Sequence, residues 1–416
     1  MSGPELCGPE LCGPELCGPE ASGPEVSGPE ASGQQTRRSP DSTVDGVRLV
    51  TKLSSPWYRV PHAHVNRRRE PALKAFRLHD WGEPPRLANV PLRSPGPGEV
   101  VLAVAAAGLC HSDLHVVDAT AGQLPFRPPF TLGHEVAGHV ASMGPEVPEV
   151  AVGDAVVVYA PWGCGRCERC RSGRRNYCDR GRELPAAGIG LGVDGGMADA
   201  LVVASSRLVP IGDLDPLTAA PLTDAALTPY HAIARCRDRL GAGSVAVVVG
   251  VGGLGHLAVQ LLRACTPCHV VAVDARETAL ALAGRSGAHA TVPAGPDAAR
   301  LIRELTDRRG ADLVLDFVAA AGTLALGQEV LRSDGELAVV GSGGGALTVR
   351  KPGPLAPGAR VSVPYWGSQP ELAEVVRLAR AGLLNVEATR FALEDAAEAV
   401  ERLRRGAILG RAVLVP

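Results

Sequence analysis

Near the middle of this chain of 416 residues, a run of apolar residues leads into a glycine-rich turn and then into an apolar helical stretch. The run is Val245–Val249, the helical stretch begins at His256, and a second apolar run ends at Asp274, nineteen residues after the last glycine. In such a strand–turn–helix unit the glycines let the backbone approach a pyrophosphate group, which rests on the helix N-terminus. The residues of the turn that we expect against this group are Gly250, Gly252, Gly253, Leu254 and Gly255.

The acidic residue after the turn indicates which dinucleotide binds. Asp274 would accept hydrogen bonds from the adenosine ribose and repel a 2′-phosphate, so the pattern predicts NAD rather than NADP. Arg276, two residues later, is the one nearby feature that would soften this preference. A purely structural glycine turn in an ordinary α/β protein is the alternative interpretation, which the complete strand and helix context disfavours.

The other apolar runs predict two different sheets. Between residues 223 and 362, apolar runs alternate with Ala-, Leu- and Arg-rich helical stretches, which is typical of a doubly wound parallel sheet. The strands expected there are Val245–Val249, Val270–Asp274, Leu313–Phe317 and Glu336–Val340. Residues 73–160 instead hold short Val- and Ala-rich runs broken by proline and glycine, which predicts a small β-rich domain. The fold class is therefore α/β, with residues 363–416 returning to shorter mixed elements.

The first 72 residues have a composition that does not predict a folded domain. Residues 3–32 are six copies of the unit Gly-Pro-Glu-(Leu/Ala/Val)-(Cys/Ser), and proline at every fifth position blocks both helix propagation and strand pairing. We expect residues 1–34 to be a disordered low-complexity repeat and residues 35–72 to be a basic, disordered linker. A transit peptide is the functional alternative, whereas the lack of an apolar h-region excludes a secretory signal. An unstructured extension, or a start codon placed too far upstream, is the preferred interpretation.

Charge and hydropathy exclude two classes of partner. The 42 Lys and Arg residues are balanced by 44 Asp and Glu residues, whereas a general nucleic-acid binder carries a clear basic excess. The longest apolar stretch, Val245 to Leu262, contains His256, Gln260 and four glycines, which is a poor match to a membrane span of about 20 apolar residues. We therefore expect a cytoplasmic protein whose partner is a small molecule and which binds neither nucleic acid nor a membrane.

Four cysteines in the β-rich half have spacings that suit a closed metal site. They are Cys164, Cys167, Cys170 and Cys178. Four thiolates from one short loop can complete a tetrahedral Zn²⁺ shell, and a closed site of four cysteines holds a fold together rather than performing chemistry. A zinc ribbon that contacts nucleic acid through neighbouring arginines and an iron–sulfur cluster are the alternatives that the spacing leaves open.

Three further short motifs carry residues with metal-binding or catalytic chemistry. Cys110-His-Ser-Asp-Leu-His115 follows an expected strand, Gly133-His134-Glu135-x-x-Gly138 comes after it, and Asp224 precedes the nucleotide-binding half. Each motif is weak alone, because a single cysteine or histidine is more often a packing or surface residue than a ligand. Their occurrence together with the four-cysteine loop and the dinucleotide motif makes them informative.

Taken together, these motifs resemble those of the zinc-dependent alcohol dehydrogenases of the medium-chain dehydrogenase/reductase superfamily. The resemblance runs from about Leu73 to Pro416, and the strongest similarity is to bacterial NAD-dependent secondary-alcohol dehydrogenases. The segments that carry it are Ala107–Asp113, Tyr159–Gly165, Pro221–Ala225 and Pro364–Gly367. The resemblance implies a GroES-like catalytic domain at 73–222 and 363–416, with the cysteine lobe at 164–178, and a Rossmann NAD-binding domain at 223–362. It also implies NAD, two zinc ions per chain, one catalytic and one structural, and a homodimer or homotetramer.

The resemblance further implies roles for individual residues. A catalytic zinc would take three protein ligands and leave one position open, and the ligands would be Cys110, His134 and Asp224. Asp113 would accept the other ring N–H of His134, and Glu135 would lie behind the ligands or bind the metal transiently. The residues expected at the cofactor are His111 and Arg411 at the pyrophosphate and Thr228 and Phe317 near the nicotinamide. Trp366 would line the substrate pocket.

The implied reaction is reversible hydride transfer between a primary or secondary alcohol and NAD⁺, as in the class EC 1.1.1.1. The metal would stabilise the alkoxide, Ser112 would receive the hydroxyl proton, and His115 would release it near solvent. A metal-free relative that reduces quinones or enones is disfavoured, because the zinc ligands are present. A zinc-dependent relative that acts on a polyol or an aldehyde, and a non-catalytic zinc- and nucleotide-binding relative, are the remaining alternatives.

Overall fold

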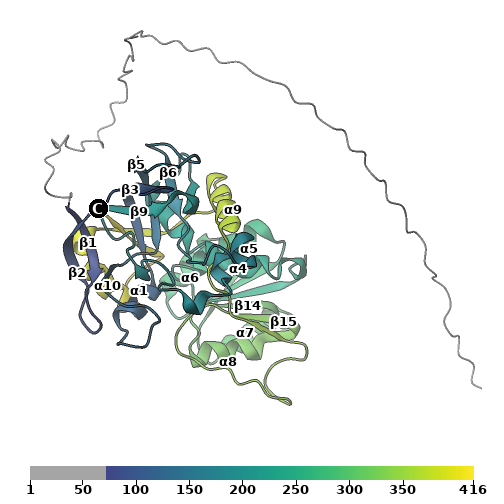
Figure 1. Cartoon of the computed structure of the whole chain (residues 1–416). Coiled ribbons are helices and arrows are strands. Elements are labelled where there is room, and N and C mark those ends of the chain that lie inside the picture. Colours follow the sequence, from purple (N-terminus) through teal and green to yellow (C-terminus); the bar gives the residue numbers. More distant parts are fainter. Residues whose placement is uncertain (1–71) are drawn as a thin grey trace, which may run out of the picture. The chain divides into compact units, whose positions relative to one another are not determined.

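The computed structural model describes residues 72–416, whose strands form two large sheets and two small ones (Figure 1). The repeat at 1–34 and all but the last residue of the segment 35–72 lie outside the described residues, so the expectations for them stay predictions. Among the helices of residues 72–416, none has the length and apolar character needed to cross a membrane.

The α/β part is a six-stranded sheet in the strand order β13-β12-β11-β14-β15-β16. All neighbouring pairs are parallel, and counted along the chain this is the order 3-2-1-4-5-6 of a dinucleotide-binding fold. The strands are β11 (Val245–Val249), β12 (His269–Asp274), β13 (Ala290–Pro293), β14 (Ala311–Asp316), β15 (Leu331–Val339) and β16 (Arg360–Ser362). The connecting helices are α5 (Gly255–Cys265), α6 (Glu277–Arg285), α7 (Ala298–Leu305) and α8 (Ala321–Val330). The expected doubly wound parallel sheet is confirmed.

Burial on both faces explains why the central strand of this sheet is a continuous apolar run. Every residue of β11 is buried, because helices cover both faces of a parallel sheet. Side chains alternate between the faces along a strand, so Val248 packs in the same cluster as Leu261 of α5, whereas Val247 packs with Ile302 of α7. The sheet thus separates two apolar layers and holds the turn after β11 at its edge.

The strand boundaries differ from the sequence expectation at the short and irregular elements. β13 and β16 have only four and three residues, too few to show a periodic pattern, and they were not among the expected strands. β15 begins at Leu331 rather than at Glu336, because Leu331 pairs with Ala311 before the register shifts. These differences do not move the turn that follows β11.

The β-rich part contains a seven-stranded sheet with the path β10-β6-β5-β3-β18-β17, in which β9 also pairs with β3. Its strands are β3 (Glu99–Leu109), β5 (Glu135–Met143), β6 (Ala155–Val158), β9 (Ala200–Ala204), β10 (Leu208–Pro210), β17 (Ala388–Ala392) and β18 (Arg411–Val415). The smaller sheets are β2-β1-β4 and β7-β8, formed by β1 (Ala72–Leu78), β2 (Arg86–Pro91), β4 (Phe130–Thr131), β7 (Gly188–Ile189) and β8 (Gly192–Val193). Because β17 and β18 follow the parallel sheet in the chain, we propose the domain division 73–222, 223–362 and 363–416.

The remaining helices pack around these sheets. The α-helices are α1 (His111–Val117), α2 (Glu168–Arg171), α3 (Pro216–Ala219), α4 (Leu227–Ala234), α9 (Gln369–Arg380) and α10 (Ala396–Arg404). The 3-10 helices are η1 (Arg175–Tyr177), η2 (Gly181–Glu183), η3 (Ser205–Arg207), η4 (Ala220–Thr223), η5 (Arg237–Arg239) and η6 (Leu393–Asp395). α9 begins with a capping box in which the Ser368 side chain accepts from the Glu371 backbone N–H, an arrangement that satisfies free N–H groups at a helix start.

Strand β3 brings the functional motifs together. Its residue Gly108 lies opposite Glu135 of β5, and Leu109 lies opposite Ala412 of β18. The residue after β3, the first residue of β5 and the first residue of β18 therefore lie at the same end of one sheet. This register places Cys110, Glu135 and Arg411 side by side, although they come from distant parts of the sequence.

Candidate active site

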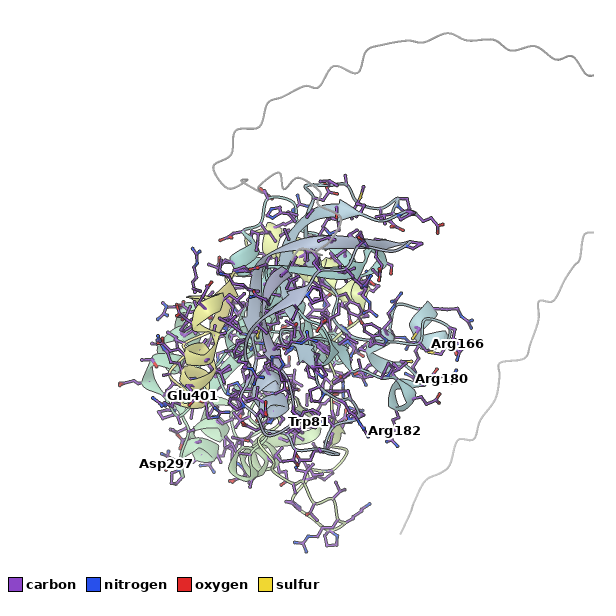
Figure 2. All side chains as sticks on the ribbon, turned by 60° about the vertical axis from the view of Figure 1, so that its left-hand side comes forward. Trp81, Arg166, Arg180, Arg182, Asp297 and Glu401 are labelled. Carbon is purple, nitrogen blue, oxygen red and sulfur yellow. The ribbon has the colours of Figure 1, made fainter. Side chains whose placement is uncertain are left out.

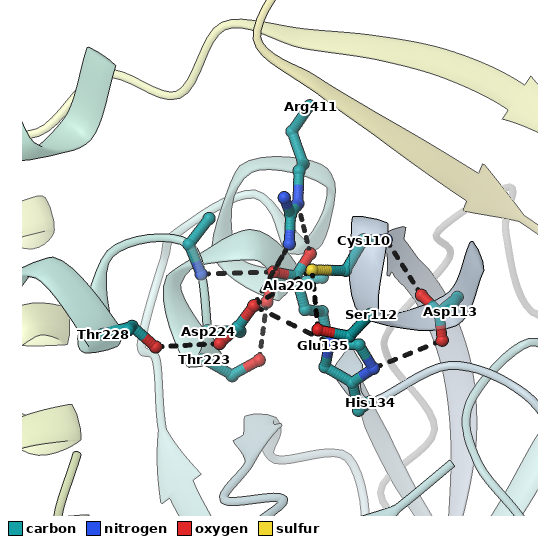
Figure 3. A network of polar contacts seen from close by, with 11 residues as sticks. Cys110, Ser112, Asp113, His134, Glu135, Ala220, Thr223, Asp224, Thr228 and Arg411 are labelled. Atoms are coloured by element: carbon teal, nitrogen blue, oxygen red, sulfur yellow. Dashed lines mark hydrogen bonds and ion pairs between the residues drawn. The ribbon is translucent and has the colours of Figure 1, made fainter. Parts of the chain in front are cut away.

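Cys110, His134 and Asp224 form a compact buried cluster with a metal-binding arrangement (Figure 3). Their ligand atoms all lie within 4.8 Å of one another. Cys110 Sγ is 3.4 Å from Asp224 Oδ2, and His134 Nε2 is 3.7 Å from the same oxygen. A tetrahedral zinc with bonds of about 2.0–2.3 Å separates its ligands by roughly 3.3–3.8 Å. The donor set of one sulfur, one nitrogen and one oxygen therefore fits zinc in both chemistry and spacing.

His134 is oriented by the buried carboxylate of Asp113. His134 Nδ1 lies 3.3 Å from Asp113 Oδ1, so Nε2 is the nitrogen that faces the cluster. The contact has an ion-pair distance but not the direction of a good hydrogen bond. Asp113 is fully buried, and its other oxygen accepts the backbone N–H of Cys110 at 2.9 Å. One carboxylate thus positions two of the three proposed ligands.

Behind the cluster lies a buried ion pair between Glu135 and Arg411. Arg411 Nε donates to Glu135 Oε2 at 2.9 Å, Nη2 donates to Glu135 Oε1, and Nη2 also lies 3.3 Å from Asp224 Oδ2. Burial raises the pKa of Glu135 to about 7, although the charge of Arg411 opposes this shift. Burial also acts to raise the pKa of Asp224, but His134, Arg411 and the Thr228 hydroxyl outweigh it and lower that pKa to about 2.

The guanidinium of Arg411 also reaches the dinucleotide turn. A Cβ atom at Gly253 would lie only 2.6 Å from Arg411 Nη1, so this nitrogen directly faces the turn. The predicted position of Arg411 at the pyrophosphate stays a proposal. Its other two nitrogens, Nε and Nη2, form hydrogen bonds with Glu135 and Asp224.

Ser112 and Thr228 each contact one member of the cluster (Figure 3). Ser112 Oγ is 3.6 Å from Cys110 Sγ and its side chain is exposed. Thr228 Oγ1 donates to Asp224 Oδ1 at 2.9 Å, so it holds the carboxylate from the side opposite Arg411. The family resemblance implies a position near the nicotinamide for Thr228 and gives no indication of this bond to Asp224.

His111 and His115 are both exposed on helix α1. His115 Nε2 lies 2.5 Å from the Ser342 hydroxyl, in the loop after β15. Although His111 has exposed surface, desolvation by the groups packed around it, followed by the charge of Arg411, lowers its pKa. Residues three apart on a helix lie on the same face, so His115 shares a face of α1 with Ser112.

The dinucleotide turn has the backbone shape that its glycines predict. Gly250 has φ +88°, and a Cβ at Gly255 would lie 2.0 Å from the Gly250 carbonyl oxygen, so side chains are sterically excluded at both positions. Asp274, at the end of β12, accepts the Val251 backbone N–H at 2.8 Å. Its other oxygen accepts the backbone N–H of Arg276 at 2.9 Å. The acidic residue therefore lies beside the turn, as the pattern predicts for a ribose-binding carboxylate.

The guanidinium of Arg276 bonds to the segment that precedes β18. Its Nη1 donates to the carbonyl oxygens of Gly406 at 3.1 Å and Ile408 at 3.3 Å, and its Nε is 3.4 Å from Asp274 Oδ1. A guanidinium with these partners has fewer free donors for a 2′-phosphate. With these partners, we expect Arg276 to weaken the preference for NAD over NADP less than its position in the sequence suggests.

The four lobe cysteines also meet at one point. Their sulfur atoms all lie within 4.8 Å of one another, with Cys164 and Cys170 at 4.0 Å and Cys167 and Cys178 at 3.9 Å. Backbone N–H groups of Arg166 and Cys167 lower the pKa of Cys164 to about 6, which favours the thiolate. A tetrahedral shell of four sulfurs fits these distances. Figure 2 shows Arg166, Arg180 and Arg182 on the outer side of the projecting lobe.

Comparison with known proteins agrees with this geometry. Residues 96–213 match the family model of the alcohol dehydrogenase GroES-like domain, and residues 253–381 match that of the zinc-binding dehydrogenases. An NAD-dependent alcohol dehydrogenase of Sulfurisphaera tokodaii is 34% identical over 355 residues, which cover 83% of this chain and 100% of that protein. The chain belongs to the zinc-dependent alcohol dehydrogenases. Their expected GroES-like and Rossmann folds are therefore confirmed together with the family.

Other relatives of this dehydrogenase show the breadth of the family. The crystal structure of an alcohol dehydrogenase from the archaeon Aeropyrum pernix superposes with a TM-score of 0.77 at 35% identity, covering 83% of this chain and 100% of that chain. A D-arabinose 1-dehydrogenase (NADP(+)) of Saccharolobus solfataricus is 32% identical, covering 82% of this chain and 97% of that protein. The matched relatives thus include both alcohol dehydrogenases and a sugar dehydrogenase.

Two aromatic side chains to which the resemblance assigns pocket roles lie close to the cluster and to the cofactor turn of this dehydrogenase. Trp366 is buried, and its ring meets the ring of His134 edge to face at a centroid distance of 5.6 Å. Phe317 follows β14 and lies beside Gly250 and Gly341 of the cofactor turn region. We propose that Trp366 lines the substrate pocket and that Phe317 lies near the nicotinamide.

One buried residue at the turn was not singled out as a site residue from the sequence. His256, the second residue of α5, lies 2.9 Å from the Gly252 carbonyl through Nδ1, and its Nε2 accepts the Glu387 backbone N–H at 3.2 Å. This histidine links the cofactor turn to the segment that precedes β17. The only feature of the sequence that could have indicated this role is the position of His256 directly after the glycine motif.

Proposed function

We propose that this zinc- and NAD-dependent alcohol dehydrogenase transfers a hydride between a small alcohol or carbonyl compound and NAD at the Cys110–His134–Asp224 centre. The observation that carries the proposal is the position of Arg411, whose guanidinium contacts both the Asp224 carboxylate and the dinucleotide turn. Bound zinc would supply a Lewis acid with one open position, and NAD would supply the hydride acceptor.

The protein's own residues orient this site and balance its charge. Asp113 holds His134 with Nε2 toward the centre, and Thr228 holds Asp224. Arg411 offsets the negative charge of Glu135 and Asp224 in a buried region. In this proposal Ser112, next to Cys110, receives the substrate hydroxyl proton, and the exposed His115 passes it to solvent.

We further propose the binding roles of the remaining site residues. Arg411 Nη1 and His111 would contact the pyrophosphate at the glycine turn, and Asp274 would bind the adenosine ribose. The cysteine lobe would hold the second zinc ion, since its four sulfurs would complete a tetrahedral shell and leave no position for substrate.

For the substrate we propose a primary or secondary alcohol, with a sugar or other polyol as the second candidate. The D-arabinose 1-dehydrogenase among the relatives favours including the second class. Initial rates with ethanol, 2-propanol, cyclohexanol, glycerol and D-arabinose would rank the two classes directly. Activity limited to D-arabinose and glycerol would place the enzyme in the second class.

We also propose that the enzyme forms a homodimer or a homotetramer. Strand β16 lies at the edge of the parallel sheet, and the side chains of Val361 in this strand and of Val363 just after it are exposed. An apolar sheet edge favours pairing with another chain. Light scattering of the purified full chain would measure its mass, and a monomer at micromolar concentration would contradict this proposal.

The test of the main proposal combines metal content with turnover. The purified enzyme is expected to contain two zinc ions per chain and to form NADH with at least one of the alcohols in the panel. Activity that survives complete removal of zinc, or no turnover with any alcohol or carbonyl compound, would overturn it.

A further inference from the structure

Trp366 has a backbone conformation that a bulky residue rarely adopts. Its φ is +48°, in the left-handed region, and only 5% of the residue is exposed. Residues other than glycine hold such a conformation only where the surrounding structure imposes it. The Trp366 ring contacts the ring of His134 edge to face. The interactions that fix the Trp366 backbone therefore also fix the position of one wall of the proposed substrate pocket.

Two side chains hold the backbone on either side of Trp366. Asn176 Nδ2 donates to the Tyr365 carbonyl oxygen at 2.9 Å, and the Tyr159 hydroxyl donates to the Gly367 carbonyl oxygen at 2.8 Å. The first bond fixes the peptide plane that precedes Trp366, and the second fixes a plane just beyond it. Both donors are buried, so water does not readily replace either bond.

Both donors belong to the cysteine lobe or to the strand end that leads into it. Asn176 lies in η1, two residues before Cys178, and Tyr159 directly follows β6, five residues before Cys164. The neighbouring Tyr177 hydroxyl lies 2.9 Å from His231 Nε2, and His231 Nδ1 lies 2.9 Å from Glu371 Oε1. The lobe is therefore linked through His231 of α4 to the start of α9, which directly follows the segment that carries Trp366.

Packing leaves this segment little room to move independently. A Cβ at Gly367 would lie 2.6 Å from Leu227 Cδ1 of α4, and a Cβ at Gly188 would lie 3.1 Å from Trp366 Cη2. Because α4 lies on one side and β7 on the other, the backbone and the indole ring cannot shift separately. A change in the two carbonyl hydrogen bonds would therefore also alter the position of the ring. The geometry thus connects the lobe with the pocket wall through two identifiable atoms, Asn176 Nδ2 and the Tyr159 hydroxyl oxygen.

We propose that Asn176 and Tyr159 are positioning residues for Trp366, so that the cysteine lobe sets the substrate selectivity of the enzyme in addition to holding the fold. The inference rests on the proposed function, because it assigns the Trp366 wall to the alcohol pocket. It extends the proposed role of the lobe from stability to the choice between small and bulky alcohols.

Two near-isosteric variants test the proposal. Tyr159→Phe removes one hydroxyl and keeps the ring, and Asn176→Asp replaces the donor Nδ2 with an acceptor of the same size. Tyr230→Phe, an equivalent hydroxyl deletion on α4 outside this segment, is the matched control. Each protein is labelled with 5-fluorotryptophan, and a Trp366→Phe sample assigns the Trp366 resonance in the ¹⁹F spectrum.

We expect the Trp366 resonance to shift in Tyr159→Phe and in Asn176→Asp and to stay in place in Tyr230→Phe. The ratio of kcat/KM for cyclohexanol to that for 2-propanol should change by about tenfold, the scale on which an apolar pocket discriminates by size. Zinc content and the Kd for NADH should match those of the unmodified enzyme.

An unmoved Trp366 resonance in both variants, or an unchanged selectivity ratio despite a lowered Tm, would overturn the proposal, since a purely structural bond lowers only the Tm. Failure of the proposed function is distinguishable. In that case the unmodified enzyme would turn over no alcohol, while the ¹⁹F spectra would still show whether Asn176 and Tyr159 position Trp366.

Discussion

Arg411 Nη2 lies 3.3 Å from Asp224 Oδ2, and both side chains are buried. The same guanidinium pairs with Glu135, so one cation serves two carboxylates beside the proposed metal site. Removing one member of a buried ion pair leaves an uncompensated charge, which typically costs about 3–5 kcal/mol. Arg411 is therefore a stability element as well as a candidate cofactor contact.

The first prediction concerns the loss of this cation. Arg411→Leu should lower the free energy of unfolding by about 3–5 kcal/mol and raise the Kd for NADH, because Nη1 faces the glycine turn. Urea unfolding and NADH fluorescence titration measure the two effects. Arg404→Leu, which removes an exposed arginine paired with Asp118, is the control and should change neither by a comparable amount.

The second prediction concerns the proposed metal ligands. Cys110→Ser should abolish turnover and lower the zinc content, while the enzyme still binds NADH, because Cys110 lies at the centre and not at the glycine turn. Metal analysis, initial rates and NADH titration are the measurements. Cys265→Ser, at the half-buried end of α5, should keep both activity and zinc, and full activity of Cys110→Ser would refute its role as a ligand.

The third prediction concerns the choice of cofactor. Asp274→Gly should raise the Kd for NAD about tenfold or more, the effect of losing hydrogen bonds to a charged acceptor, and shift the preference toward NADP. Asp274→Asn keeps an acceptor for the Val251 N–H and should give an intermediate result. An unchanged ratio of kcat/KM for NAD and NADP in Asp274→Gly would argue against ribose binding by this residue.

The fourth prediction concerns the proton path. Ser112→Ala should reduce kcat by about 10²–10⁴, the usual contribution of a positioned proton-transfer group. His115→Gln should have a smaller effect that high buffer concentration restores, because the side chain is exposed and buffer can replace it. The pH dependence of kcat in several buffers checks both, and Ser112→Ala with unchanged kcat would exclude this residue from the path.

The fifth prediction is a pH dependence of stability from His256. Burial lowers the pKa of His256 from 6.5 to about 4. Below pH 6.5 the unfolded chain takes up a proton that the folded chain takes up only near pH 4. The contribution of neutral His256 to the free energy of unfolding is therefore fully present above pH 6.5. It decreases by about 3 kcal/mol as the pH falls to 4.

Urea unfolding between pH 7 and pH 4 measures this contribution as the difference between the unmodified enzyme and His256→Gln. The difference should shrink as the pH falls through this range. A constant difference for His256→Gln would show that its burial does not control its protonation.

The sequence predicted the parallel sheet from local patterns, whereas the proposed ligand set came only from the family resemblance. The strand–turn–helix unit at Val245–Leu262 is continuous in the chain, and Cys110 and His134 directly adjoin strands with clear apolar character. The Glu135–Arg411 pair was not predicted, because it depends on β18 pairing with β3 across most of the chain. The bonds from Asn176 and Tyr159 depend on how a loop packs against a distant segment, and no periodic pattern records that contact.

The insertion of the parallel sheet between strands of the β-rich part has a mechanical consequence. Strands β1 and β18, the first and last of the described residues, both lie outside the parallel sheet. A pulling force applied at residues 72 and 416 would therefore shear β18 from β3 and peel β1 from β2 before it loaded β11 or the glycine turn. The cofactor-binding sheet is shielded from tension by the strands that complete the active site.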